Sequence, residues 1–191
     1  QYTDDINRPN QLYIRILRSP YAHGRITELD VSAARSRPGV EAVYTASDLT
    51  SLGGLPCRAA LKNAQGEPAF IPHRPILAED KVLFVGQAIA AVVAQTPEQA
   101  ADAVEAIDLS VDDLPVCSDL SAALNPDTLP IHDTRTDNLC VHFEQGSATD
   151  VDQALASGAH RISVSLVNNR VVPSPLEPRA TLVEPADEGF S

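Results

Sequence analysis

Two charged side chains near the end of the sequence have the types and the spacing for ligand binding. Glu177 and Arg179 stand in the proline-rich stretch PSPLEPR. Proline restricts the backbone, and a pre-positioned arginine can donate two parallel hydrogen bonds to a carboxylate or a phosphate. The two residues can equally be loop charges, because surface ion pairs are common and weak. The pair is therefore a candidate site whose role stays open.

A second candidate is Gly86-Gln87, which separates two apolar runs. A buried Gln87 could present its amide to a ligand. Alternatively, Gly86 allows a turn or a bulge, and Gln87 satisfies backbone groups there. The sequence leaves both interpretations open.

Cys140 and His142 are two positions apart, so on a strand their side chains would share a face, as metal binding requires. Only His132 and Asp133 are near enough in sequence to add ligands to such a site. The other histidines are isolated in the sequence: His23, His73 and His160. The sequence contains no Gly-rich phosphate loop, nucleophile elbow or HExxH motif. We therefore assign no catalytic residue and no metal site.

Composition limits the classes of function. The 191 residues suffice for one large domain, or for one domain with an extension. Fourteen basic and 26 acidic side chains give a net charge of -12, which disfavours nucleic acid as a partner. The three cysteines, Cys57, Cys117 and Cys140, contain no CxxC pair and favour a reducing compartment. No apolar run approaches about 20 residues, so we expect no membrane span.

The apolar pattern predicts the elements that must position these side chains. Runs of alternating or continuous apolar residues predict strands at 12–17, 24–31, 40–44, 82–85, 88–94 and 107–111. A short helical turn is expected after residue 31, stopped by Pro38 and Gly39. Thr96 and Gln99 form a capping-box signature at the start of a longer helix, whose Ala100 and Ala103 share one face. Strands together with helices in this order indicate a mixed α/β or α+β fold.

The remaining segments are less regular. We expect a turn capped by Ser47 and a long loop over residues 50–80, which is rich in Gly and Pro. A helix at 119–124, a connector at 125–138 and strands at 139–146, 160–167 and 179–184 complete the prediction. A further helix should begin after Asp150 and end at Gly158.

Three segments, taken together, are distinctive. They are YTDDINRPNQLYIRILRSPYAHGRITELDVSAARSRPGVEAVYTASDL, LAEDKVLFVGQAIAAVVAQTPEQAADAVEAIDLSVDDLPV and NNRVVPSPLEPRATLVE. In combination they resemble the N-terminal part of the large, molybdopterin-binding subunit of the xanthine dehydrogenase, aldehyde oxidase and carbon monoxide dehydrogenase family. The resemblance covers nearly the whole chain.

The resemblance implies an α/β hammerhead domain at residues 1–124. A connector and the incomplete start of the molybdenum-cofactor-binding domain would follow at 125–191. In the family, the full subunit holds a molybdenum pterin cofactor and works with iron–sulfur and usually flavin units. It hydroxylates an aldehyde or an N-heterocycle with oxygen from water, and carbon monoxide oxidation is the exception.

The resemblance also implies that the family's cofactor loops and its catalytic glutamate lie beyond Ser191. We therefore expect this chain alone to hold no cofactor and to be inactive, with the rest of its subunit and the iron–sulfur and flavin units as partners. The chain begins at Gln1 and contains no Met, which favours a piece of a longer polypeptide. The cytoplasm is the expected compartment, with the periplasm left open.

Two alternatives remain. One is a separately encoded, non-enzymatic hammerhead module that serves assembly or binding. The other is a small acidic enzyme that uses Glu177, Arg179 and Gln87. The substrate and the oligomeric state stay open.

Overall fold

The computed structural model describes residues 2–169, 171–177, 179–187 and 189–190. The chain forms two compact units, one of Leu12–Glu144 and one of Gln1–Gln11 with Gln145–Ser191. Each unit is described by itself. The mixed α+β class is confirmed by the strands and helices below. The domain boundary between residues 124 and 125 stays a prediction.

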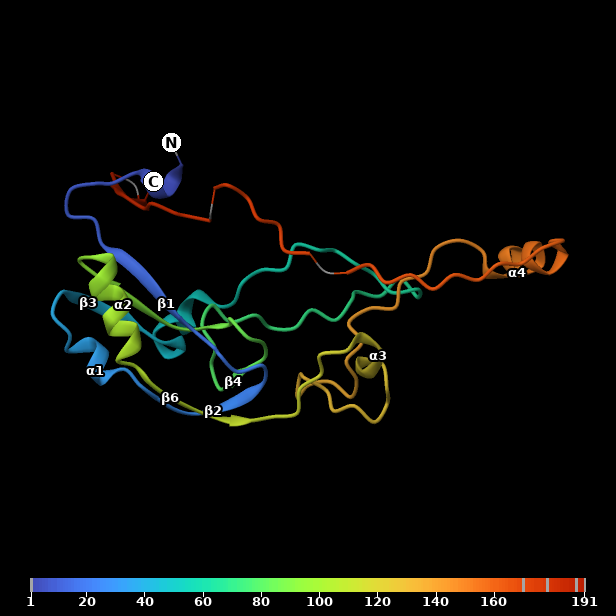
Figure 1. Ribbon diagram of the computed structural model, residues 1–191, viewed down its shortest axis with the longest axis horizontal. Coiled ribbons are helices and arrows are strands. Elements are labelled where there is room, and N and C mark those ends of the chain that lie inside the picture. Colours follow the sequence, from blue (N-terminus) through green and yellow to red (C-terminus); the bar gives the residue numbers. More distant parts are fainter. Residues whose placement is uncertain (1, 170, 178, 188, 191) are drawn as a thin grey trace. The chain divides into compact units, whose positions relative to one another are not determined.

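Two three-stranded antiparallel sheets build the larger unit (Figure 1). The first sheet has the order β1-β5-β3, with bounds Tyr13–Arg18, Ala88–Ala94 and Val40–Tyr44. The second has the order β4-β2-β6, with bounds Lys81–Val82, Gly24–Asp30 and Asp108–Asp113. The predicted strands are therefore confirmed to within two residues, except at 82–85. There the strand ends at Val82, and Phe84 and Val85 are exposed.

Strand β5 lies at the centre of the first sheet, where its apolar residues become the core. Ala90 and Val92 belong to one buried cluster and Ile89 to another. Burying one such valine or isoleucine side chain stabilises a fold by about 1.5–3 kcal/mol. The continuous apolar run of residues 88–94 is explained by this central position.

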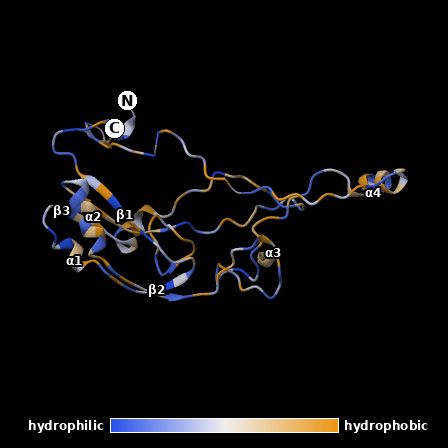
Figure 2. Ribbon diagram, in the orientation of Figure 1, coloured by the Kyte–Doolittle hydropathy of each residue, from blue (hydrophilic) through white to orange (hydrophobic). Residues whose placement is uncertain are grey.

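Two helices follow strands in the larger unit. Helix α1 (Ser32–Arg35) is the predicted short turn, and α2 (Pro97–Glu105) packs on β1 and β5. The buried face of α2 carries Ala100 and Ala103, as predicted. Figure 2 shows hydrophobic and hydrophilic residues interleaved on α2, as expected for a helix with one buried face.

The N-terminal cap of α2 is half of the predicted capping box. The Thr96 hydroxyl accepts a hydrogen bond from the Gln99 backbone N–H at 3.2 Å. The reciprocal bond from the Gln99 side chain is absent among the hydrogen bonds of the described residues. Instead, the Gln99 amide lies where a Cβ on Gly39 would stand, 2.2 Å from the Gln99 Oε1. Gly39, with φ of 78°, therefore makes room for this side chain.

The loop that follows β3 begins with a 3-10 helix, η2 (Ala46–Leu52). Its first turn is held by Asp48, whose carboxylate accepts from both the Thr45 backbone N–H and the Thr45 hydroxyl. The prediction that Ser47 caps this turn is therefore wrong, because the cap stands two residues earlier. Residues 53–80 form the predicted long loop, with isolated bridges from Gly54 to Pro75 and from Lys62 to Pro68.

A short helix, α3 (Leu120–Ala123), precedes the predicted connector, and Asp119 caps it by accepting from the Ala122 N–H. The strand predicted at 139–146 is wrong. Two backbone bonds join this segment to the long loop, from the N–H of Phe70 to the Cys140 carbonyl and from the N–H of Ala64 to the His142 carbonyl. These isolated bonds do not form a ladder, so the segment stays irregular.

The smaller unit contains η1 (Thr3–Asp5), α4 (Ala148–Ser157) and a two-stranded hairpin, β7 (Pro185–Ala186) with β8 (Gly189–Phe190). Helix α4 ends at Gly158 as predicted, but its cap is Ser147 rather than Asp150. The Ser147 hydroxyl accepts from the Asp150 N–H at 3.3 Å. Serine thus caps the helix three residues before the predicted cap.

The strands predicted at 160–167 and 179–184 are wrong for the residues that the structure describes. The alternating apolar side chains are present, but neither segment has a neighbouring strand among the described residues to complete a hydrogen-bonded ladder. As a result, Ile162 is 87% exposed and Leu166 86% exposed.

Candidate functional site

The Gly86-Gln87 pair closes a tight turn that faces β1. The Gln87 side-chain oxygen accepts from the Leu83 backbone N–H at 2.7 Å. Backbone bonds of 2.8 Å join Ser19 to both residues of the pair, and the Arg18 guanidinium donates to the Gly86 carbonyl. Gly86 has a φ of 89°, which few residues other than glycine adopt. With Gln87 only 8% exposed, this geometry favours the interpretation that Gln87 satisfies backbone groups.

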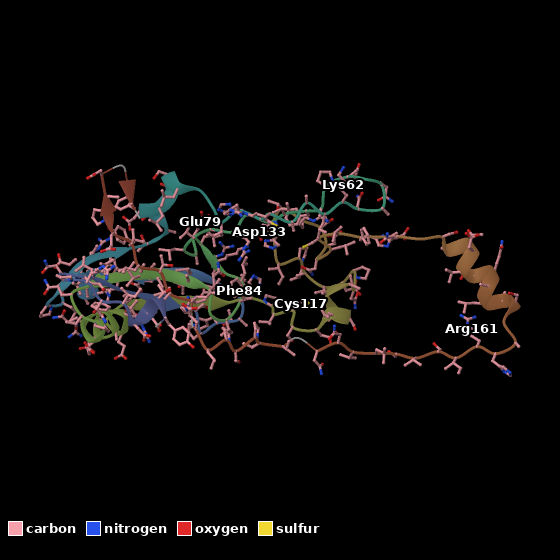
Figure 3. The ribbon with its side chains drawn as sticks, turned by 90° about the horizontal axis from the view of Figure 1, so that it is seen from above. Lys62, Glu79, Phe84, Cys117, Asp133 and Arg161 are labelled. Atoms are coloured by element: carbon pink, nitrogen blue, oxygen red, sulfur yellow. The ribbon has the colours of Figure 1, made fainter. Side chains whose placement is uncertain are left out.

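A cluster of charged and imidazole side chains forms where the connector crosses the β4-β2-β6 sheet. We define the connector cavity as the space of about 380 Å³ between the end of this sheet and residues 129–135. Lys81 on β4 donates to both carboxylate oxygens of Asp133 on the connector. The side chain of Lys81 is 12% exposed and that of Asp133 is 73% exposed, so the pair sits at the rim of the fold. Figure 3 labels Asp133 in this region.

The ion pair lowers the pKa of one connector residue, and burial lowers the pKa of its neighbour. The hydrogen bond from Lys81, followed by its positive charge, lowers the pKa of Asp133. Burial lowers the pKa of the neighbouring His132, while the Asp133 carboxylate partly opposes that shift. His132 also contacts the edge of the Phe70 ring, with ring centroids 5.8 Å apart. The connector is therefore held to β4 by one ion pair and to the long loop by one aromatic contact.

His23 lies at the other wall of the connector cavity and is 7% exposed. Its Nδ1 is 2.7 Å from the Pro115 carbonyl oxygen, and a carbonyl can only accept, so Nδ1 carries the proton. Its Nε2 is buried and has no hydrogen-bond partner in the part of the chain that the structure describes. No local sequence pattern indicates this arrangement, because His23 is isolated in the sequence.

The register of the second sheet explains how His23 reaches the cluster. Strand β2 pairs with β4 so that Gly24 faces Val82 and Arg25 faces Lys81. This pairing brings Arg25 and Lys81 together, although the two residues are far apart in the sequence. No local sequence pattern predicts that they are neighbours. A sequence-based argument could find the cluster only by first predicting the strand register.

The residues proposed as metal ligands do not come together. The described residues contain no group of three or more His, Cys, Asp or Glu side chains that could hold a metal ion. His142 lies 3.2 Å from the Glu144 carboxylate, and Asp133 is occupied by Lys81. Cys140 and His132 do line one cavity of about 190 Å³, but His142 does not. The strand that was to place Cys140 and His142 on one face is absent.

Glu177 contacts the N-terminal arm and not Arg179. Its carboxylate accepts from both the backbone N–H and the hydroxyl of Thr3 at 3.2 Å. A second contact within the same unit joins Arg8 to Glu184 at 2.8 Å. Glu177 and Arg179 are both exposed, and Pro178 of the same motif lies outside the described residues. The functional role of the pair stays a prediction.

No helix within the described ranges is long and apolar enough to cross a membrane.

Comparison with known proteins identifies the larger unit. The family model described as "Aldehyde oxidase and xanthine dehydrogenase, a/b hammerhead domain" matches residues 1–115. The 6-hydroxypseudooxynicotine dehydrogenase complex subunit gamma of Paenarthrobacter nicotinovorans is 34% identical over 96% of this chain and 23% of its own length. The carbon monoxide dehydrogenase large chain of Hydrogenophaga pseudoflava is 36% identical over 92% of this chain and 22% of its own.

A solved structure has the same fold. The crystal structure of Cu,Mo-CO dehydrogenase in its carbon monoxide reduced state has a TM-score of 0.71 and 32% identity. The match covers 84% of this chain and 20% of that one. This chain thus spans less than a quarter of the length of these three proteins. Because the family model covers well over half of the residues and the fold agrees with a solved relative, the chain belongs to the aldehyde oxidase and xanthine dehydrogenase family and carries its a/b hammerhead domain.

Proposed function

We propose that this chain is the hammerhead-containing part of the large subunit of a molybdenum-dependent hydroxylase. The observation that carries the proposal is the alignment of 92–96% of the chain with subunits named as dehydrogenases of 6-hydroxypseudooxynicotine and of carbon monoxide. The hydroxylase would insert oxygen from water into a carbon of an N-heterocycle or an aldehyde. Carbon monoxide oxidation is the second reaction that these relatives support.

The described residues offer no group of three His, Cys, Asp or Glu side chains near enough to one another to hold a metal ion directly. The side chains proposed for chemistry are either satisfied by backbone groups, as Gln87 is, or exposed, as Glu177 and Arg179 are. We therefore assign no step of the reaction to residues of this chain. The molybdenum pterin would be held by other parts of the subunit, with iron–sulfur and flavin units as partners.

The contribution of this chain would be structural support for the catalytic part of the subunit. The two sheets and α2 form a core of small and branched side chains that needs no ligand to close. A non-enzymatic hammerhead module that serves only assembly would use the same core. The two proposals differ in whether the complete polypeptide turns over substrate.

The test uses the complete polypeptide that contains these residues, produced together with its companion subunits. Carbon monoxide, a set of aldehydes and a set of N-heterocycles are offered with an artificial electron acceptor in isotope-labelled water. We expect reduction of the acceptor with one class of substrate, and labelled oxygen in the product. A cofactor-loaded complex that reduces the acceptor with none of them would contradict the enzymatic proposal and favour the assembly module.

A further inference from the structure

The first sheet of the larger unit has one covered face and one open face. Helix α2 packs on β1 and β5, and its Ala103 shares a buried cluster with Val43, Ala90 and Val92 of the sheet (Figure 1). Successive side chains of a strand point to opposite faces, so the residues between these lie on the other face of the sheet.

The strand register places six apolar side chains on that other face. We call them the open face, and they form two rows across β1, β5 and β3: Ile14–Val93–Ala42 and Ile16–Ala91–Tyr44. Ile14 is 67% exposed and Tyr44 is 42% exposed, at opposite edges of the sheet. The other four side chains are half-buried. The open face is therefore apolar and accessible to a partner.

The sequence of the central strand indicates that both faces of this sheet are meant to be buried. In an antiparallel sheet with one solvated face, strands alternate between apolar and polar residues. Strand β5 reads AIAAVVA and carries no polar side chain on either face. A continuous apolar run of this kind is typical of a strand that is covered on both faces.

The second sheet shows the contrasting pattern within the same chain. Leu109 and Val111 of β6 pack against a buried cluster, and Asp108, Ser110 and Asp112 alternate with them. The other side of β6 is therefore polar, as expected for a sheet face that stays in water. The first sheet lacks such polar residues on its open face, and contiguous exposed apolar side chains mark an interaction surface.

We propose that the open face is the docking surface for the remainder of the large-subunit polypeptide, which covers it with an apolar layer. This inference rests on the proposed function. The matched part is only 23% and 22% of the length of the two relatives, so most of such a subunit lies outside these 191 residues. A segment of the same polypeptide is also present at a high effective concentration, whereas a second copy must be recruited from solution.

The test is the labelling of introduced cysteines with a maleimide, resolved by site with mass spectrometry so that the native cysteines are counted separately. Ile14→Cys reports on the open face. Glu28→Cys is the matched control, because Glu28 is an exposed strand residue of the second sheet. Both variants are made in the 191-residue chain and in the complete polypeptide with its companion subunits.

Both cysteines should react rapidly in the 191-residue chain, since both positions are exposed there. In the complete polypeptide, the cysteine of Ile14→Cys should react at least about tenfold more slowly, because a covered thiol reacts only when its cover opens. The cysteine of Glu28→Cys should react at a similar rate in both proteins.

Three results would overturn the proposal. They are equal rates for Ile14→Cys in the two proteins, equal slowing of both variants in the complete polypeptide, and slowing of Ile14→Cys that grows with the concentration of the 191-residue chain. The last result would mean that a second copy covers the face. The labelling needs no substrate, so protection of Ile14→Cys in a complex without turnover would support the docking surface and contradict only the proposed hydroxylase.

Discussion

At the scale of single residues, hydrogen bonds to the backbone explain two of the polar side chains that the sequence singled out. Gln87 accepts from Leu83 and Thr96 accepts from Gln99. Asp48, which no sequence pattern singled out, accepts from Thr45 in the same way. Each of these side chains replaces a partner that a turn or a helix end leaves missing. The geometry of Gln87 therefore favours a role in the local fold.

The cap of α2 gives a direct test at this scale. Thr96→Ala leaves one backbone N–H of the first turn without its partner and should lower the free energy of unfolding by about 1 kcal/mol. Urea denaturation followed by circular dichroism measures the change. Thr136→Ala, on an exposed loop, is the matched control and should change stability by less than about 0.5 kcal/mol. Equal decreases in the free energy of unfolding for the two variants would show that the Thr96 cap does not stabilise the fold.

His132 should make stability depend on pH. Burial lowers its pKa in the folded chain, so below about pH 6.5 the unfolded chain binds more protons at this residue. The contribution of neutral His132 to folding stability is therefore fully present above the pKa that this residue has in the unfolded chain. That contribution is lost as the pH falls below this value. We expect the free energy of unfolding to decrease between about pH 7 and pH 5, and to decrease less in His132→Gln. Parallel pH profiles for the two chains would contradict this.

At the scale of elements, the small side chains of α2 determine how closely it packs. Ala103 is fully buried in the cluster with Ala90 and Val92. Ala103→Leu must displace these neighbours and should cost about 1–3 kcal/mol. Ala101→Leu, on a half-buried position of the same helix, is the control and should cost less. Thermal melts of the two variants decide the point, and a neutral Ala103→Leu would mean that another face of α2 meets the sheet.

Elements with strong local signals could be predicted from the sequence, and elements that depend on a neighbour could not. Residues 88–94 carry a continuous apolar pattern and were predicted to the residue, and the capping signature at Thr96 predicted where the helix at 97–105 begins. Residues 160–167 alternate equally well, but a strand also needs a partner to accept its hydrogen bonds. The same dependence on neighbouring elements explains why local motifs could be predicted as candidate sites and the cavity at His23 could not. The cavity at His23 depends on the register of β2 against β4 and on the position of the connector beside them.

At the scale of the whole molecule, the smaller unit exposes a series of apolar side chains. Its large exposed apolar residues include Ile162, Val164, Leu166, Val172 and Leu176. Exposed apolar surface of this kind favours association with another chain, and the charge of -12 opposes it only over about 8 Å at physiological salt.

We therefore expect the 191-residue chain to self-associate as its concentration rises. Light scattering should show a mass that increases with concentration, and removal of residues 160–191 should restore the monomer. The amide signals of Leu12–Glu144 serve as the control that the larger unit stays folded. A strictly monomeric chain at high concentration would show that this apolar surface does not drive association.

We propose that this chain is the supporting part of a molybdenum hydroxylase subunit whose metal is held elsewhere. The molybdenum content per polypeptide is the most direct test of this proposal. One assay compares the 191-residue chain with the complete subunit. The account predicts about one molybdenum atom per complete polypeptide and close to none on the 191-residue chain produced in the same cells. Stoichiometric molybdenum on the 191-residue chain, or none on the complete polypeptide, would contradict it.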